Sequence, residues 1–409
     1  MSQVQVSADV EERFEAFVQA DPSVDRVSLY RDCRSEPVFF SRSLGAYVLT
    51  RYDDVLRVLK DGERFPTLDA GPGSTVYGRT ILHMRGDEHT KKRRIASRQM
   101  QSARATERVD AFLADTCRRL TEALPMAPEV VDLKKAYCMW IPLLVIGELM
   151  DVSEPERFCD WYSTISAGSM SSMGHPERRE RALVAVRELG EFLKPLIDER
   201  RANPGDDVIS DYTRAEYDGR AIPDEEIVAI AALLLTAGVE TTERGLASLF
   251  CHLVEDRGLW DAVRGDRSLV ESTAAEGLRL MPPIHAVTRQ AVHDEQFGDP
   301  VVPAGSNLFV LVASGNRDDA QFTDPDTFDP ARFKDDAGRQ FTAAGQVLPF
   351  GAGMHYCAGS QLVRVEMRRG LNAFMDRVDH AELAYGVPET VGFLLRSPAT
   401  LEVVLSPAS

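Results

Sequence analysis

Cysteine is scarce in this sequence, and its few residues are widely separated. They form no CxxC pair and no Cys/His spacing of the kind that binds zinc. This pattern argues against both a disulfide framework and structural zinc, and it fits a reducing compartment. The six cysteines are Cys33, Cys117, Cys138, Cys159, Cys251 and Cys357.

Long apolar runs and excess positive charge are also missing. No run is long enough to span a bilayer, and Met1 to Asp9 has neither a basic flank nor an apolar signal core. We therefore expect a soluble cytoplasmic protein without a membrane partner. The 47 Lys and Arg residues against 64 Asp and Glu give a net charge of −17, which disfavours nucleic acid as a partner.

The 409 residues suffice for one large domain or two modest ones, and helical periodicity dominates. We expect a short flexible N-terminus of about 15 residues. Short strands are predicted at 46–50, 284–289 and 308–313, and a terminal hairpin is predicted to pair 391–395 with 401–405. Helices are predicted over 10–21, 53–60, 109–124, 131–150, 155–165 and 176–200, and from Asp87 and Pro223 onward.

The most informative stretch is the glycine-rich run from Pro349 to Gly359, which contains Cys357 and precedes an amphipathic helical pattern. The thiolate of a cysteine just before a helix N-terminus is favoured by the helix dipole and by nearby backbone N–H groups. Such a sulfur can ligate iron. A buried free cysteine beside a turn is the usual alternative for a lone cysteine.

The spacing Phe-Gly-x-Gly-x-His-x-Cys-x-Gly resembles the heme-binding loop of the cytochrome P450 family. The resemblance implies that Cys357 is the thiolate ligand of heme b and that His355 binds a heme propionate. Phe350 would pack near the sulfur, and Gly351 and Gly359 would let the backbone approach the cofactor. The implied fold is mainly α with small β regions, a triangular prism formed by residues 1–409 as one domain.

Three further residues fit the propionates of a heme. His89 and Arg93 are four apart on the helix predicted from Asp87, so they share a face. Together with the cysteine loop, this pair resembles the propionate-binding helix of the family. Arg289, on a predicted strand, matches another propionate-binding arginine.

The apolar run from Ile227 to Leu235 predicts a buried helix that continues through Glu240, Thr241 and Thr242. Ala237, Gly238, Glu240 and Thr241 resemble the oxygen-activation segment of the family. The resemblance implies that Glu240 and Thr241 carry protons to dioxygen and that Gly238, beside Ala237, makes room for it. A threonine that only hydrogen-bonds its own helix is the alternative.

Glu276 and Arg279 are three apart on a predicted helix, where a carboxylate and a guanidinium can form a bidentate pair. In the family such a pair is joined by a downstream arginine, for which the sequence offers Arg332. We expect a structural role for all three.

Substrate-contacting residues are predicted on a loop at 66–83, a small-residue stretch at 166–174, the central helix, a strand and the terminal hairpin. His285 departs from the apolar residue usual in relatives, so it either contacts a polar substrate group or faces away. The predicted pocket residues are Leu82, Leu234, Ile284, His285, Val287, Phe393 and Leu394.

The resemblance implies a monooxygenase that uses dioxygen and two electrons to hydroxylate or epoxidise a mainly apolar small organic molecule, in secondary metabolism. We expect no fused flavin or iron–sulfur module, so NAD(P)H-dependent ferredoxin reductase and ferredoxin are the predicted electron source. Arg364, Arg368 and Arg369 are candidate docking residues, unless they only form a solvated face. A peroxide-driven enzyme, an oxidative coupling or cyclisation enzyme, and a non-catalytic heme protein remain as alternatives.

Overall fold

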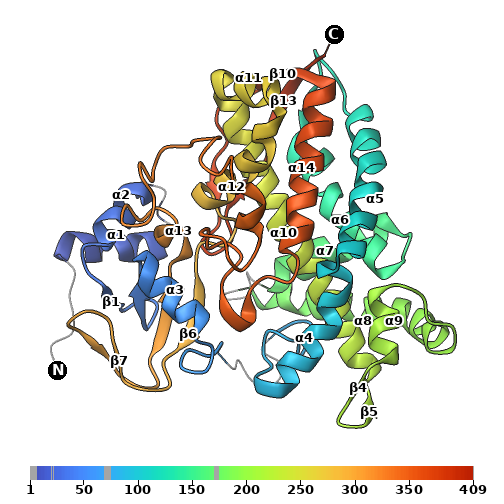
Figure 1. Cartoon of the computed structure of the whole chain (residues 1–409), viewed down its shortest axis with the longest axis horizontal. Helices are drawn as coiled ribbons and strands as arrows, with labels where there is room; N and C mark the ends of the chain where they lie inside the picture. Colours follow the sequence, from blue (N-terminus) through green and yellow to red (C-terminus); the bar gives the residue numbers. More distant parts are fainter. Residues whose placement is uncertain (1–6, 20, 22, 69–74, 170–174, 409) are drawn as a thin grey trace. The chain divides into compact units, whose positions relative to one another are not determined.

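The computed structural model describes residues 7–19, 21, 23–68, 75–169 and 175–408 (Figure 1). The chain divides into two compact units, so the single domain stays a prediction. Unit 1 comprises Met1–Leu68, Arg244–Cys357 and Ala381–Val403. Unit 2 comprises Asp69–Glu243, Ala358–His380 and Val404–Ser409.

Helices make up most of the described chain, as predicted (Figure 1). The longest, α10 (Asp224–Glu255), starts just after Pro223 with three acids in its first turn, a favourable helix start. Its first part belongs to unit 2 and its last part to unit 1. The other helices of unit 2 are α4 (Gly86–Gln101), α5 (Ala103–Glu122), α6 (Trp140–Met150), α7 (Pro155–Ser169), α8 (Pro176–Ala202), α9 (Val208–Arg214) and α14 (Ser360–Arg377).

Unit 1 contains a four-stranded sheet and a set of shorter helices. In the sheet, β2 pairs antiparallel with β1 and parallel with β9, and β9 pairs antiparallel with β6. The strands are β1 (Val38–Ser41), β2 (Ala46–Leu49), β9 (Asn307–Val310) and β6 (Val287–Gln290). The helices are α1 (Ala8–Val18), α2 (Arg26–Cys33), α3 (Tyr52–Lys60), α11 (Arg257–Gly265), α12 (Val270–Leu280) and α13 (Val312–Gly315).

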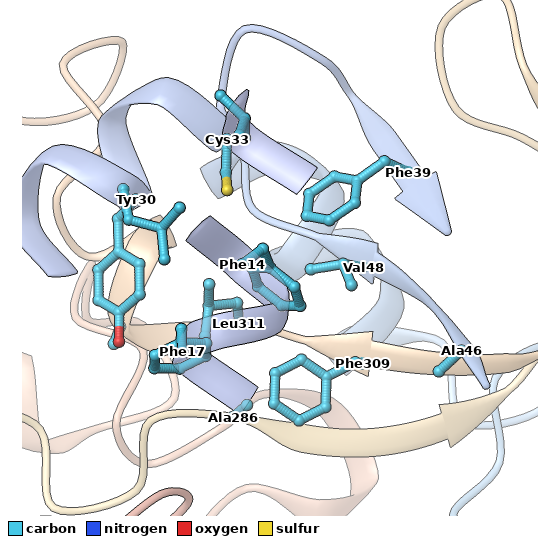
Figure 2. Packing of buried hydrophobic residues seen from close by; sticks show 13 residues of the cluster. Phe14, Phe17, Tyr30, Cys33, Phe39, Ala46, Val48, Ala286, Phe309 and Leu311 are labelled. Atoms are coloured by element: carbon cyan, nitrogen blue, oxygen red, sulfur yellow. The ribbon is translucent and has the colours of Figure 1, made fainter. Parts of the chain in front are cut away.

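An aromatic cluster joins α1 and α2 to the sheet of unit 1 (Figure 2). The ring of Phe14 lies edge-on to Phe39 at 5.0 Å, and Phe17 lies edge-on to Tyr30 at 6.0 Å. Burying side chains of this size supplies much of the hydrophobic stabilisation of a small core. From Ala8 onward the chain forms α1, whose Phe14 is fully buried, and the flexibility of the N-terminus stays a prediction.

The predicted terminal hairpin is wrong in its pairing. Instead, β11 (Thr390–Val391) pairs with β12 (Ser397–Pro398), and β13 (Glu402–Pro407) lies between β10 (Val378–Leu383) and β3 (Val130–Asp132). Alternating apolar residues identify a strand but not its partner. The remaining strand pairs are β4 (Glu216–Tyr217) with β5 (Arg220–Ala221) in unit 2, and β7 (Glu295–Gln296) with β8 (Val301–Val302) in unit 1.

Two predicted helix boundaries also differ. The helix expected over 131–150 is β3, a short π-helix η1 (Lys134–Cys138) and α6, whereas α7 extends to Ser169. Part of the predicted loops, residues 69–74 and 170–174, lies outside the described residues. Within the described ranges, no single helix is long and apolar enough to cross a membrane; one strongly bent pair, Lys134–Met150 with Pro155–Ser169, meets the length and composition criteria together.

Candidate functional site

The predicted site residues are divided between the two units. Unit 1 holds Cys357 and its preceding loop, Arg289, and the predicted pocket residues of the strand and the hairpin. Unit 2 holds His89, Arg93, Gly359, and the segment of α10 from Leu234 to Glu243.

The cysteine loop of unit 1 is a series of tight turns. The backbone N of Cys357 donates to the carbonyl oxygen of Phe350 at 2.8 Å, which closes the loop on itself. Gly351 and Gly353 have φ of +68° and +66°, a region that favours glycine. A Cβ on Gly353 would lie 2.5 Å from the carbonyl oxygen of Lys60, so the loop packs directly on α3.

The sulfur-bearing residue stands at the end of this loop. Cys357 is half-buried and is not part of a disulfide, and Gly359, the N-cap of α14, follows two residues later. Phe350 is buried, and its ring lies 5.6 Å from that of Phe341. His355 is half-buried on the same loop.

Arg289 is a buried cation on β6, with 8% of its surface exposed. Its Nη1 donates to the carbonyl oxygen of Thr288 at 2.8 Å, and no carboxylate of the described residues lies within ion-pair distance. Burial lowers the pKa of Arg289 to about 10. Since a buried guanidinium requires an anionic partner, Arg289 has the chemistry expected of a carboxylate-binding group.

In unit 2, α4 brings His89 and Arg93 together as their spacing predicts. His89 is buried and Arg93 is half-buried. Burial lowers the pKa of His89, and the positive charge of Arg93 lowers it further. His89 is therefore a neutral imidazole near pH 7 and can serve as a hydrogen-bond donor.

One short face of α10 is open although the helix around it is buried. Ala237 is exposed, and Gly238 and Thr241 are half-exposed, whereas Leu235 and Val239 are fully buried. The Thr241 hydroxyl donates to the carbonyl oxygen of Ala237 at 3.0 Å, the local bond considered as the alternative from sequence. Ala237 is thus exposed on this face, with the half-exposed Thr241 one helical turn away.

Gly238 also has a packing role that the sequence did not reveal. A Cβ at this position would lie 2.7 Å from Cδ1 of Ile146 on α6. The glycine therefore permits α6 to approach α10 closely, in addition to any role on the open face.

Two carboxylates of α10 are held by hydroxyl groups of α7. Ser166 Oγ donates to Glu240 Oε2 at 2.5 Å, and the Tyr162 hydroxyl donates to Glu243 Oε2. Tyr162 and Ser166 are four apart, and Glu240 and Glu243 are three apart, so each pair lines one helix face. The sequence analysis missed both hydroxyl partners, since helical spacing does not identify which helices face each other.

A second polar contact missed from sequence lies between α10 and α14. The Thr242 hydroxyl donates to Glu366 Oε2 at 3.3 Å, and both residues are buried. Burial raises the pKa of Glu366 to about 8, so its carboxyl group is largely protonated at neutral pH.

The Glu276 network of unit 1 has the predicted form. Glu276 accepts from Nε and Nη2 of Arg279 at 2.7 and 2.8 Å, and from Nε of Arg332 at 3.0 Å. Glu276 and Arg279 are fully buried. Arg279 also donates to the carbonyl oxygens of Asn316 and Pro325 at 2.8 and 2.7 Å, so it ties α12 to the following loops.

A family model described as Cytochrome P450 matches residues 36–384. The chain belongs to the cytochrome P450 family.

Curated relatives of this P450 include enzymes of known reactions. The cyclomarin C epoxidase CymV of Salinispora arenicola is 32% identical over 371 residues, covering 88% of this chain and 90% of that protein. The erythromycin C-12 hydroxylase of Saccharopolyspora erythraea is 31% identical, covering 84% of each chain. Pulcherriminic acid synthase of Bacillus subtilis is 29% identical, covering 91% of this chain and 93% of that protein.

Solved P450 structures have the same fold. CYP109Q5 of Chondromyces apiculatus superposes with a TM-score of 0.81 at 26% identity, covering 94% of this chain and 96% of that one. A mutant of EryK in complex with erythromycin B superposes with a TM-score of 0.79 at 27% identity, covering 97% of each chain. The chain is accordingly a P450 monooxygenase.

Family membership implies heme with a cysteine thiolate ligand, and the residues of each unit fit such a group. In unit 1 the fit rests on a cysteine in a tightly closed glycine loop and on Arg289, a buried cation without a carboxylate partner. In unit 2 it rests on the open face at Ala237 and on the donors His89 and Arg93.

The predicted pocket residues of this P450 fall into two groups. Phe393 stacks on Phe309 at 5.8 Å and contacts Phe17 at 5.1 Å, and His285 Nδ1 lies 2.9 Å from the Tyr30 hydroxyl. Phe393 and His285 therefore pack with residues of the aromatic cluster of unit 1. The others are placed as follows: Leu82 is exposed, Leu234 is buried, Ile284 bridges Leu395, Val287 pairs with Val310, and Leu394 packs on the cluster.

The basic residues of α14 are partly neutralised. Asp110 on α5 binds Arg368 at 2.5 Å and Arg369 at 2.8 and 2.5 Å. One carboxylate thus serves two guanidinium groups. On α4, Lys91 pairs with Asp87, and Lys92 pairs with Glu88 and Glu226.

Proposed function

We propose that this P450 is a heme b monooxygenase that hydroxylates or epoxidises a mainly apolar secondary metabolite, with Cys357 as the thiolate ligand. The observation that carries the proposal is the carboxylate of Glu240, held by Ser166, beside Thr241 on the open face of α10. The relatives named as a hydroxylase and an epoxidase support the reaction type.

Each unit by itself contains residues suited to the cofactor. In unit 1, Cys357 would bind the iron, and Arg289 and His355 would bind propionate oxygens. In unit 2, His89 and Arg93 would offer further donors. Phe350 and Gly351 shape the loop at the sulfur. Heme bound in this way supplies the activation of dioxygen once two electrons have been delivered.

Proton delivery falls to the residues of α10. The Glu240 carboxylate accepts a hydrogen bond from Ser166, which fixes its orientation, and it would carry protons as a general acid–base group. The Thr241 hydroxyl, now bonded to Ala237, lies on the open face and presents an O–H donor there. A peroxide-driven enzyme has less need of such a pair.

We propose that electrons come from a separate ferredoxin and an NAD(P)H-dependent reductase. An acidic ferredoxin would dock near Arg364, Arg368 and Arg369, through long-range attraction that weakens with salt. Turnover by the purified chain with NAD(P)H alone would overturn this part of the proposal.

In unit 2, the residues proposed for substrate contact are Leu82, Leu234 and Ala237. In unit 1, they are Ile284, Val287 and Leu394. These side chains are mainly apolar, which matches a mainly apolar ligand. His285 and Phe393 stay predicted contacts as well, and both also pack with residues of the aromatic cluster, as Leu394 does.

The first test is the carbon monoxide difference spectrum of the reduced protein. We expect a red-shifted, thiolate-type Soret band in the wild type and its loss in Cys357→Ser. A histidine-type band in folded wild-type protein would refute the assignment of Cys357.

The second test addresses the acid–alcohol pair. With ferredoxin, reductase and a substrate found by spin-state change, Thr241→Ala should lower product formed per NAD(P)H and raise peroxide release. Thr236→Ala is the matched control, because Thr236 makes the same local bond, to Ala232 at 2.9 Å, but is buried. Equal coupling in Thr241→Ala and wild type would contradict the proposed role.

A further inference from the structure

Two arginines of unit 1 carry positive charge that no carboxylate neutralises. Arg26, at the start of α2, and Arg396, in the turn before β12, are both half-buried. Neither forms an ion pair with any acid in the described part of the chain, although most arginines here do. Glu389, which is exposed, has the smallest of the named effects on the pKa of Arg396.

The two guanidinium groups act on each other and on the same neighbours. Burial lowers the pKa of Arg26. The pKa of Arg396 is lowered to about 10, mainly by burial and further by the positive charge of Arg26. Both arginines also influence Tyr30, which is buried, and His285, which is bonded to Tyr30. The four side chains therefore form one group, here called the arginine cluster.

The contacts that Arg26 and Arg396 make do not use all of their N–H donors. Arg396 donates to the carbonyl oxygens of Gly392 and Thr390 at 2.6 and 3.1 Å. Arg26 lies over the ring of Phe17 at 4.7 Å, and its Nη1 is buried without a hydrogen-bond partner (Figure 2 shows Phe17 beside the Tyr30 hydroxyl). An unpaired buried donor on a cation is costly, unlike a donor that faces water.

The other ionisable groups near the arginine cluster do not neutralise the charges of Arg26 and Arg396. Burial and three nearby arginines hold the pKa of His285 well below its usual range, so His285 is neutral. The third arginine, Arg317, is already paired with Asp326 at 2.9 Å. Asp25 caps α2 by accepting from the backbone N of Val27 at 3.1 Å and is exposed.

We propose that Arg26 and Arg396 bind an oxyanion, a carboxylate or a phosphate group, with the neutral Tyr30–His285 pair behind it. Each guanidinium presents a planar fork of N–H donors that matches two oxygens of such a group. A single anion would relieve the repulsion between the two cations and satisfy the buried Nη1 donor of Arg26. The inference is independent of the proposed reaction.

The test is calorimetric titration of the heme-loaded protein with inorganic phosphate and, separately, with benzoate, at ionic strength matched with chloride. We expect saturable binding of at least one anion. Saturation by phosphate alone identifies a phosphate site, and saturation by benzoate alone identifies a site for organic acids. Absence of saturable binding by both would overturn the proposal.

Variants assign the binding to the cluster. Arg26→Gln and Arg396→Gln should each weaken the affinity for the anion about tenfold or more, since each substitution removes one guanidinium group. The matched control is Arg31→Gln, on the same helix and with the same charge change, because Arg31 is paired with Asp326 at 2.5 Å. Affinity that falls equally in Arg31→Gln, or stays unchanged in both cluster variants, would refute the assignment.

A stability measurement separates binding from a merely structural role. In chloride alone, Arg26→Gln should not lower the melting temperature, because it removes a repulsive charge, but it should abolish the increase caused by the bound anion. Should Arg26→Gln fail to fold, Arg396→Gln gives the same readout. A variant that melts lower in chloride yet keeps the full anion-induced increase would contradict the inference.

Discussion

Replacing Glu276 by glutamine should cost this P450 a large part of its stability. The substitution keeps the size of the side chain but removes its charge. Glu276 is fully buried and accepts hydrogen bonds from Arg279, Arg332 and the backbone N of Asp329 at 2.7 to 3.0 Å. Three groups donate to this one carboxylate. The NH2 group of glutamine cannot accept hydrogen bonds, so it would lie against N–H donors.

The size of the effect follows from the burial of the partners. Removing one member of a buried ion pair costs about 3–5 kcal/mol, since the other charge remains in the interior. Arg279 is fully buried and would keep only carbonyl partners, whereas Arg332 is 14% exposed in its side chain and can reach water. We therefore expect a loss of about 3–5 kcal/mol, mostly from Arg279, out of a total of about 5–15 kcal/mol.

The assay is urea unfolding of the heme-loaded protein, followed by circular dichroism. The matched control is Asp261→Asn, which removes one charge from the exposed Arg257–Asp261 pair, with N···O at 2.9 Å, and should cost at most about 1 kcal/mol. If Glu276→Gln unfolds at the same urea concentration as the control, the reasoning about buried charge is refuted.

Three further predictions concern the cysteine loop and two glutamates. Gly353→Ala should reduce heme-loaded protein far more than Gly351→Ala, as measured by the ratio of heme to protein absorbance, because only the first places a Cβ against a backbone oxygen, at 2.5 Å; equal ratios would contradict this. The pKa of Glu366 is raised to about 8 by burial, so stability should fall as pH rises from about 4.3 to 8, and Glu366→Gln should flatten this fall in a melting series. The hydrogen bond from Arg79 lowers the pKa of Glu88 to about 2, so its contribution is present above about pH 4.3 and is lost on acidification toward pH 2. Glu88→Gln should remove this acid-side loss, and an unchanged acid melting profile would count against it.

The local parts of the site could be predicted because their residues are close in sequence. The cysteine loop is one continuous turn-rich segment whose glycines are required by positive φ, and His89 with Arg93 share a face through helical spacing. The pair Glu276 and Arg279 follows from the same spacing. Their cofactor roles stay predictions.

Other parts could not be predicted because they depend on which elements face each other. Ser166 was placed in a loop from sequence, yet it lies on α7 and binds Glu240 across a helix contact. From the sequence, the three arginines of α14 were candidates for a docking surface. In the structure, Asp110 of α5 neutralises part of their charge. The hydrogen bond between His285 and Tyr30, which are far apart in sequence, likewise could not be predicted.

The sequence by itself determined the family, the helical fold class and the local motifs, because hydrophobic period, helix spacing and turn glycines act over a few residues. Only the tertiary structure decided the strand partners, the hydroxyl that holds Glu240, the protonation of Glu366 and the uncompensated charge of Arg26 and Arg396. Those properties depend on burial and on contacts between distant residues. They cannot be inferred from the order of charged residues, because the sequence does not show whether a charged side chain is solvated or buried.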